Sequence, residues 1–182
     1  MKKTLIVIDM QNDFIDGSLG TAEAVKIVPN VRKKIEEYRS NGDEIIFTRD
    51  THGEDYLSTP EGKKLPVVHC VKNTHGWQIA DGLDVPDAIH IDKPSFGYSH
   101  WDKFCFEKIE LAGLCTDICV VSNALILKAL FPNAEISVDS ACCAGVTPET
   151  HNSALATMKM CQIDVYCFTP VFSTAFFIIT YF

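Results

Sequence analysis

The sequence predicts an α/β protein with three layers, in which helices cover both faces of a parallel sheet of about six strands. Short apolar runs rich in Ile, Val and Phe alternate along the chain with segments of helical periodicity. Several of the runs are apolar on both faces, which is typical of strands buried between two layers of helices. No linker or internal repeat interrupts the alternation, so we expect one domain over residues 1–182.

The strands are expected where the apolar runs are shortest and densest in Ile, Val and Phe. The first run, TLIVI, ends just before Asp9, and the second, EIIFT, ends just before Arg49 and Asp50. The predicted bounds, in chain order, are Thr4–Ile8, Glu44–Thr48, Ala88–Ile91, Lys108–Ala112, Glu135–Val138 and Asp164–Phe168.

Three clear helices are expected between these strands. Residues 28–40 place apolar side chains on one helical face, and the Asn41-Gly42 pair behind them is a helix stop. The predicted helices are Val28–Ser40, Val120–Leu130 and Pro148–Met160.

Charge and composition exclude several classes of function. The formal net charge of −8 disfavours a nucleic-acid backbone or an anionic membrane as partner. The apolar run before Asp9 is too short for a signal peptide, and no stretch approaches the roughly 20 apolar residues of a membrane span. We therefore expect a cytoplasmic protein whose eight cysteines are mostly reduced and buried; the adjacent Cys142 and Cys143 are interpreted as core filler.

Polar residues follow several of the predicted strands. In open α/β sheets, ligands bind beyond the carboxyl ends of the strands. That edge would carry Asp9, Asp50, Lys93 and the segment GLCTDICV at 113–120. We therefore expect the functional site there.

Cys119, Lys93 and Asp9 could together perform covalent catalysis. A cysteine at a helix N-terminus is favoured as the nucleophilic thiolate, and a nearby ammonium would lower its pKa further. A carboxylate could take the thiol proton and later deliver it to a leaving amine. Each residue alone also has an ordinary interpretation, as a capping aspartate, a solvated lysine or a small core cysteine.

The sequence resembles the isochorismatase-like cysteine hydrolases, and among them the nicotinamidases. The resemblance covers roughly residues 4–168 and rests on VIDMQNDF at 7–14, TRDTH at 48–52, DKPSFGY at 92–98 and GLCTDICV at 113–120. It implies a Rossmann-like fold, hydrolysis of a small amide and, by family analogy, a homo-oligomer.

The resemblance assigns the catalytic roles residue by residue. Asp9, Lys93 and Cys119 match the family's triad in chain order. The family also has a cis peptide bond before its Thr-Asp-x-Cys segment, which corresponds to Leu114–Cys115. The backbone N–H groups of Cys115 and Cys119 would then form the oxyanion hole.

A metal site is the second candidate constellation. Oxygen and imidazole donors follow the second predicted strand and suit zinc, iron or manganese. The irregular stretch that contains them, residues 50–87, is longer than a simple connection, and such loops are usually functional. By resemblance, zinc would be the principal metal, with iron or manganese as alternatives, and the ligands would be Asp50, His52, Glu61 and His69. Glu54 and Asp55 are alternative carboxylates to Glu61.

Aromatic side chains could hold a ring-shaped substrate. Phe14, Phe96 and Tyr98 are predicted to bind it, and Trp77 is a further candidate. The chain departs from the family at Pro66, where many members carry Trp or Phe. It departs again at residues 170–182, an uncharged apolar segment of high β-propensity.

Four functions are compatible with these patterns. The leading hypothesis is a metal-dependent nicotinamidase that converts nicotinamide to nicotinate and ammonia for NAD salvage. A related amidase acting on another small amide or an N-carbamoyl compound is the alternative. Isochorismatase chemistry is disfavoured because members that perform it lack the cysteine found here at Cys119. A non-catalytic binding protein is disfavoured because the triad is complete.

Overall fold

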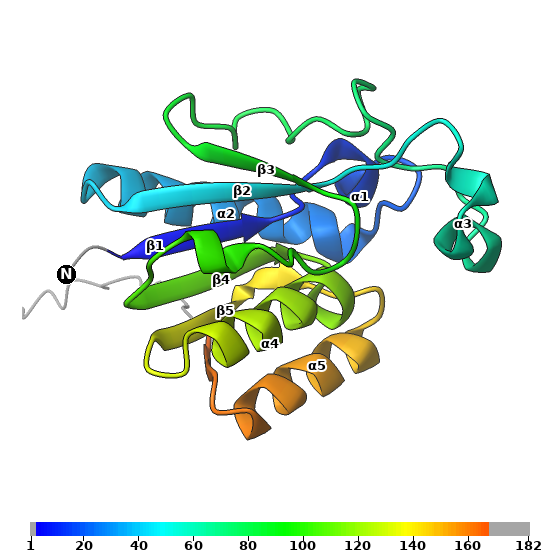
Figure 1. Cartoon of the computed structure of the whole chain (residues 1–182). Helices are drawn as coiled ribbons and strands as arrows, with labels where there is room; N and C mark the ends of the chain where they lie inside the picture. The colour runs from blue at the N-terminus through cyan, green and yellow to red at the C-terminus, as the bar shows by residue number, and fades with distance from the viewer. Residues whose placement is uncertain (1–2, 168–182) are drawn as a thin grey trace, which may run out of the picture.

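The computed structural model describes residues 3–167, which form one sheet of six parallel strands with flanking helices (Figure 1). The strand order is β3-β2-β1-β4-β5-β6, and each neighbouring pair is parallel. The strands are β1 (Thr4–Ile8), β2 (Glu44–Asp50), β3 (Ile89–Lys93), β4 (Lys108–Leu114), β5 (Glu135–Ala144) and β6 (Asp164–Tyr166). The predicted α/β fold is confirmed.

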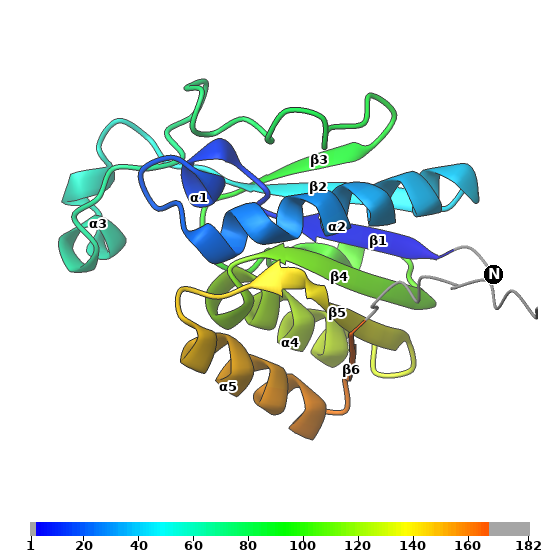
Figure 2. The ribbon, with the colours of Figure 1, turned by 180° about the vertical axis from the view of Figure 1, so that it is seen from behind.

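Helices cover both faces of the sheet, and each face has its own apolar core (Figures 1 and 2). On one face lie α1 (Asn12–Ile15) and α2 (Ala22–Ser40); on the other lie α4 (Val121–Leu130) and α5 (Pro148–Met160). The remaining α-helix, α3 (Pro60–Lys64), is short and lies beyond the end of the sheet. None of the helices within residues 3–167 is both long enough and apolar enough to cross a membrane.

The strand order reverses between β1 and β4. From β1 the chain adds β2 and β3 toward one edge, and from β4 it adds β5 and β6 toward the other. The connections therefore diverge at the carboxyl ends of β1 and β4, which is where open α/β sheets form a ligand crevice.

Three strands run two residues further than predicted, and their last residues are those expected in the site. The sequence prediction ended these three strands at Thr48, Ile91 and Ala112. The ladder continues because Arg49 pairs with Asp92 in register, with 2.7 Å between guanidinium nitrogen and carboxylate oxygen. Asp50 and Lys93, which close their strands, are partners in the next register position.

Two other elements are longer than predicted. Helix α2 begins at Ala22 rather than Val28, because Thr21 caps it by accepting a hydrogen bond from the Ala24 N–H at 3.0 Å. Pro29 therefore lies inside the helix. Strand β5 continues to Ala144 rather than ending at residue 138, although its sequence becomes polar at that point.

The start of α4 also differs from the prediction. A turn of π-helix, Thr116–Val120, precedes it, so Cys119 lies within this turn and does not open the α-helix. The first three residues of the predicted last strand form β6. Its final residue, Phe168, and the apolar segment 170–182 lie outside the described residues.

A polar cluster whose charged members are all buried, called the buried polar cluster below, joins α2 to three strands. It consists of Lys34, Tyr38, Glu110, Asp139 and the partly exposed Tyr166. The Lys34 ammonium lies 2.8 Å from an Asp139 carboxylate oxygen and also pairs with Glu110. The Tyr38 and Tyr166 hydroxyls donate to the two oxygens of Glu110 at 2.6 and 2.5 Å. This cluster explains why β5 continues through Asp139, since the carboxylate is buried with a cation as partner.

Candidate active site

The three residues predicted as a catalytic triad meet at the switch point between β1 and β4. Asp9 directly follows β1, Lys93 ends β3, and Cys119 lies in the π turn after β4. The Lys93 ammonium lies 2.6 Å from Asp9 Oδ2 and 3.6 Å from Cys119 Sγ. All three side chains are buried, so the ammonium compensates a carboxylate that has no access to solvent.

Burial decides the protonation of this triad. It raises the pKa of the Cys119 thiol well above its usual value, and the nearby Asp9 carboxylate raises it further, while Lys93 acts against both. Burial also raises the pKa of Asp9, although Lys93 lowers it. Lys93 lowers the thiol pKa as expected, but desolvation by burial outweighs it, so the net direction is upward. Lys93 therefore faces both the Asp9 carboxyl group and the Cys119 sulfur and acts on the pKa of each in the direction opposite to burial.

Two further groups hold the ion pair in place. The Thr48 hydroxyl donates to Asp9 Oδ1 at 2.6 Å, and the backbone N–H of Asp9 donates to the Thr48 carbonyl at 3.2 Å. Lys93 donates to the Ser95 carbonyl at 3.1 Å. The lysine is thus surrounded by oxygen acceptors, and burial, which would lower its pKa, is outweighed by Asp9 and the other negative neighbours, which raise it.

The turn after β4 has the backbone geometry that the resemblance implied. The Leu114–Cys115 peptide bond is cis. Gly113 has φ +123°, and a Cβ there would lie 2.0 Å from the Ile8 carbonyl oxygen, so only glycine lets β4 approach β1 this closely. The Asp117 carboxylate accepts from the Val146 N–H at 3.1 Å. Asp117 therefore ties the turn that carries Cys119 to the segment after β5.

Asp50, His52, Glu61 and His69 form one compact cluster beside the triad. Their candidate ligand atoms all lie within 4.8 Å of one another. The His52 Nε2 lies 3.1 Å from Asp50 Oδ2 and 3.8 Å from Glu61 Oε1; for His69 Nε2 these distances are 3.8 and 4.0 Å. Atoms that each lie about 2.0–2.2 Å from a zinc ion are separated by about 3–4 Å. The donor set and spacing therefore fit a divalent metal.

Neighbouring polar groups orient His69 and keep Asp50 charged, and both effects favour binding of a cation. The Nδ1–H of His69 donates to the Val67 carbonyl at 2.8 Å, which leaves Nε2 facing the cluster. Asp50 Oδ1 is buried without a hydrogen-bond donor within residues 3–167. Burial would raise the pKa of Asp50, but its hydrogen bonds to His52 and His69 lower it well below its usual value. A carboxylate that stays charged is a good metal ligand.

The loop that supplies these ligands folds around Tyr56. The Tyr56 ring packs against the rings of His52 and His69, with centroids 4.6 and 4.9 Å apart, and its hydroxyl donates to the Leu65 carbonyl at 2.9 Å. Glu61 lies in the first turn of α3, which Thr59 caps. The structure brings Glu61 into the cluster, and not the alternatives, Glu54 and Asp55.

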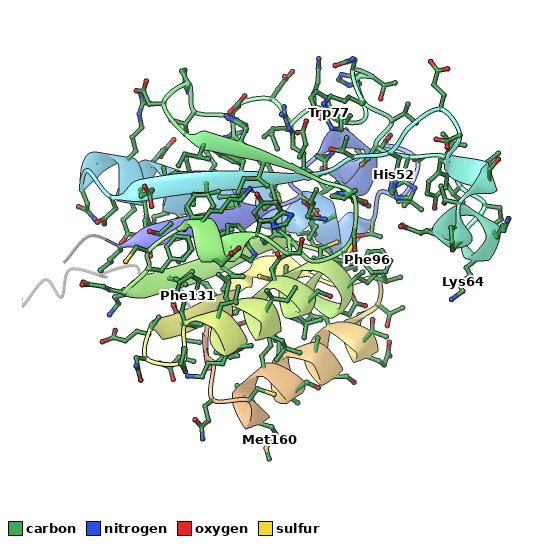
Figure 3. The ribbon with its side chains drawn as sticks, viewed as in Figure 1. His52, Lys64, Trp77, Phe96, Phe131 and Met160 are labelled. Atoms are coloured by element: carbon green, nitrogen blue, oxygen red, sulfur yellow. The ribbon has the colours of Figure 1, made fainter. Side chains whose placement is uncertain are left out.

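A cavity of about 240 Å³ connects the two constellations. Cys119 and Cys115 line it on one side, and Asp50, Glu61 and His69 on the other. Most of the remaining wall is apolar, and it includes the predicted ring-binding residues Phe14 and Phe96. Figure 3 shows His52 and Phe96 at the end of the sheet near α3.

Two predicted aromatic residues do not line this cavity. The Tyr98 ring packs against Trp101, with centroids 5.1 Å apart, and joins the core beneath α4. Trp77, labelled in Figure 3, stacks under the Arg49 guanidinium at 3.9 Å, and its indole N–H donates to Thr51 Oγ1. Tyr98 is therefore a correction to the substrate-binding set, because its ring is used in packing.

Sequence reasoning also missed a residue that orients the metal cluster. The fully buried Gln11 side chain accepts from the Asp50 N–H at 2.7 Å and donates to the Asp50 carbonyl at 2.9 Å and the Trp77 carbonyl at 2.8 Å. The available signals were its place two residues after Asp9, at the end of a buried strand, and its position within the motif VIDMQNDF at 7–14. Gln11 fixes the backbone of Asp50 against β1.

Comparisons with known proteins agree with this geometry. The sequence is 28% identical to the nicotinamidase of Schizosaccharomyces pombe, over 88% of this chain and 91% of that protein. It is 32% identical to a "probable inactive nicotinamidase" of Arabidopsis thaliana, over 85% and 87%. The structure of the pyrazinamidase of Pyrococcus horikoshii in complex with zinc has a TM-score of 0.76 and 29% identity, covering 92% and 100%.

A protein-family model also matches almost the whole chain. The isochorismatase domain matches residues 3–175, which include every strand of the sheet and both constellations at its carboxyl edge. The protein belongs to the isochorismatase family.

Proposed function

We propose that the protein is a metal-dependent nicotinamidase, which hydrolyses nicotinamide to nicotinate and ammonia in NAD salvage. One observation carries the proposal: a single cavity of about 240 Å³ is lined by both the Cys119 thiol and ligands of the candidate metal cluster. A small aromatic amide in this cavity contacts both groups at once. The apolar wall, which includes Phe14 and Phe96, suits the faces of its ring.

The proposed reaction has two stages, formation of a thioester on Cys119 and its hydrolysis, and the triad acts in both. The Cys119 sulfur attacks the amide carbon as its proton passes to Asp9, and Lys93, which faces both groups, offsets the negative charge as it moves from the carboxylate to the sulfur. The backbone N–H groups of Cys115 and Cys119 donate to the oxyanion. Collapse of the tetrahedral intermediate breaks the C–N bond, and the Asp9 proton leaves with ammonia. Water, deprotonated by Asp9, then cleaves the thioester and restores the thiol.

Asp50, His52, Glu61 and His69 would hold the metal ion. When bound, the ion supplies a Lewis acid that can hold a ring nitrogen of the substrate. The chain's own residues orient the cluster, since Gln11 fixes Asp50 and the Val67 carbonyl fixes His69.

The decisive experiment measures ammonia release from nicotinamide by the purified protein with zinc, iron or manganese. We expect metal-dependent release that Cys119→Ala abolishes. The matched control is Cys161→Ala, because that thiol is exposed and far from the cavity lining. Full activity in Cys119→Ala would show that the nucleophile is assigned wrongly.

The same assay distinguishes the remaining alternatives. Release from N-carbamoyl compounds or other small amides, but not from nicotinamide, would replace the proposed substrate and keep the cysteine mechanism. A folded, metal-loaded protein that hydrolyses none of them would favour a non-catalytic role on this fold.

A further inference from the structure

Asn123, in the first turn of α4, is buried and uses its full hydrogen-bonding capacity. Its Oδ1 accepts from the backbone N–H of Tyr98 at 2.9 Å and from the indole N–H of Trp101 at 3.0 Å. Its Nδ2 donates to the carbonyls of Phe96 at 3.1 Å and Cys119 at 2.8 Å. A side-chain amide with two donors and two acceptor positions engaged is held in one orientation.

These four bonds join two segments that both reach the cavity. One is the 94–101 loop, which follows Lys93 and contributes Phe96 to the cavity wall. The other is the turn that carries Cys119. The loop lies so close to α4 that a Cβ on Gly97 would be 2.5 Å from the Ile126 side chain. It also supplies the Ser95 carbonyl that accepts from Lys93.

We propose that Asn123 is a positioning residue that fixes the 94–101 loop against the Cys119 turn. Its bonds to the loop determine where the Phe96 side chain lies in the cavity wall. Its bond to the Cys119 carbonyl determines the orientation of the nucleophile. The catalytic part of this role rests on the proposed function. Asn123 itself does not line the cavity, so it acts only through the residues it holds.

Two substitutions separate the effect of the loop contacts from the effect of the Cys119 contact. In Asn123→Thr, the hydroxyl can still donate to the carbonyl four residues earlier, that of Cys119, but it cannot span the three loop contacts. Asn123→Ala loses all four bonds. We expect Asn123→Thr to raise KM about tenfold with kcat within about threefold of the parent, and Asn123→Ala to raise KM and also lower kcat at least about tenfold.

Leu127→Ala is the matched control for lost stability. Leu127 lies one turn further along α4 and is equally buried, but as an apolar side chain it makes none of the four hydrogen bonds, and it does not line the cavity. It should lower the melting temperature and leave KM and kcat within about twofold of the parent at temperatures well below the transition. If the Asn123 variants alter KM and kcat no more than Leu127→Ala does, the proposal is overturned.

A second readout needs no substrate. Peptide-resolved mass spectrometry measures alkylation of Cys119 by a bulky maleimide relative to iodoacetamide, with the exposed Cys161 as internal reference. Because Phe96 of the loop and Cys119 line the same cavity, loosening the loop should widen access to the thiol. Both Asn123 variants should therefore raise the relative maleimide rate at Cys119 at least about fivefold, and Leu127→Ala should not.

The two readouts keep the proposals distinct. An unchanged alkylation ratio in both folded variants would overturn the positioning role whatever the substrate is. A raised ratio in a protein that releases no ammonia from nicotinamide would support the positioning role and reject the proposed function. If Asn123→Ala does not fold, Asn123→Thr decides by the same measurement.

Discussion

At the scale of single residues, the immediate neighbours of Asp9, the proposed proton acceptor, control its carboxyl group. Asp9 has φ +46°, an uncommon backbone conformation that turns its side chain toward Lys93 directly after β1. Its two carboxylate oxygens have different partners: Lys93 contacts Oδ2, and the Thr48 hydroxyl donates to Oδ1. Burial raises the pKa of Asp9, while Lys93 and Thr48 lower it. Asp9 is thereby kept as a base that can also return a proton.

Removing the Thr48 hydroxyl should shift the acidic limb of the pH–rate profile. Thr48→Val keeps the shape of the side chain but loses a hydrogen bond that stabilises the charged carboxylate, so the pKa of Asp9 rises further. Asp9 must be deprotonated to accept the thiol proton, and the limb should therefore move to higher pH by about 1 unit. The measurement is kcat/KM for amide hydrolysis as a function of pH.

Thr4→Val is the control for this prediction. Thr4 begins β1, at the end of that strand away from Asp9, and its hydroxyl also donates to a carboxylate, Glu44 Oε2, at 3.0 Å. Its profile should match that of the parent. A Thr48→Val profile that coincides with the parent would mean that the acidic limb reports a group other than Asp9.

At the scale of elements, the metal cluster connects a strand end to a loop that has little regular structure. Asp50 closes β2, whereas His52, Glu61 and His69 come from the following stretch, in which the short α3 is the longest helix. An ion bound to all four side chains would cross-link this stretch to the sheet. Metal binding should therefore stabilise the fold.

Added zinc should raise the melting temperature of chelator-treated protein. At a free zinc concentration about 1,000 times the Kd, the expected stabilisation is about 4 kcal/mol. His69→Ala should lose most of this gain, and His100→Ala, which removes an exposed histidine outside the cluster, should keep it. Equal shifts in the parent and in His69→Ala would place the zinc elsewhere. Calorimetry measures this without any substrate.

The sequence predicted these elements well where one local pattern determines them. Apolar runs located all six strands, and the rule that ligands lie at carboxyl ends placed Asp9, Lys93 and Cys119 at one edge before their distances were known. Element ends were less accurate, because Arg49 and Asp92 look like loop residues until they pair across β2 and β3.

Residues that act through distant partners could not be predicted. Gln11 bonds to positions 39 and 66 residues away, and Asn123 bonds to a loop more than 20 residues earlier. Neither has a periodicity or spacing that indicates its role. The pKa of Cys119 was missed for a related reason, since the degree of burial that raises it is a property of the assembled fold.

At the scale of the whole molecule, the buried polar cluster fastens α2 to the half of the sheet that carries β4, β5 and β6. Lys34 is its only cation, facing the carboxylates of Glu110 and Asp139. Burial would lower the pKa of Lys34, but hydrogen bonds to Asp139 and Glu110 raise it above its usual 10.5. Its stabilisation is therefore fully present below pH 10.5 and is lost only as the pH rises through the still higher folded-state value.

Lys34→Met should destabilise the protein by about 3–5 kcal/mol at pH 7, because it leaves buried carboxylates without their cation. The loss should be similar from about pH 6 to pH 9, since the parent lysine stays charged throughout that range. Lys26→Met, which removes an exposed ion pair from the same helix, should cost less than about 0.5 kcal/mol. Urea unfolding measures both; equal midpoints would show that the cluster adds no net stability.

The position of Lys93 has a consequence for how the site can be studied and altered. Its ammonium lies 2.6 Å from the proposed base, Asp9, and 3.5 Å from the proposed metal ligand, Asp50. Protonating one of these carboxylates, or binding a cation to it, changes the electrostatic field at the other one. Titration curves of this site therefore belong to the group of residues as a whole. Binding a cation at Asp50 would for the same reason alter the proton chemistry at the sulfur, so metal binding and acid–base tuning at this site are coupled.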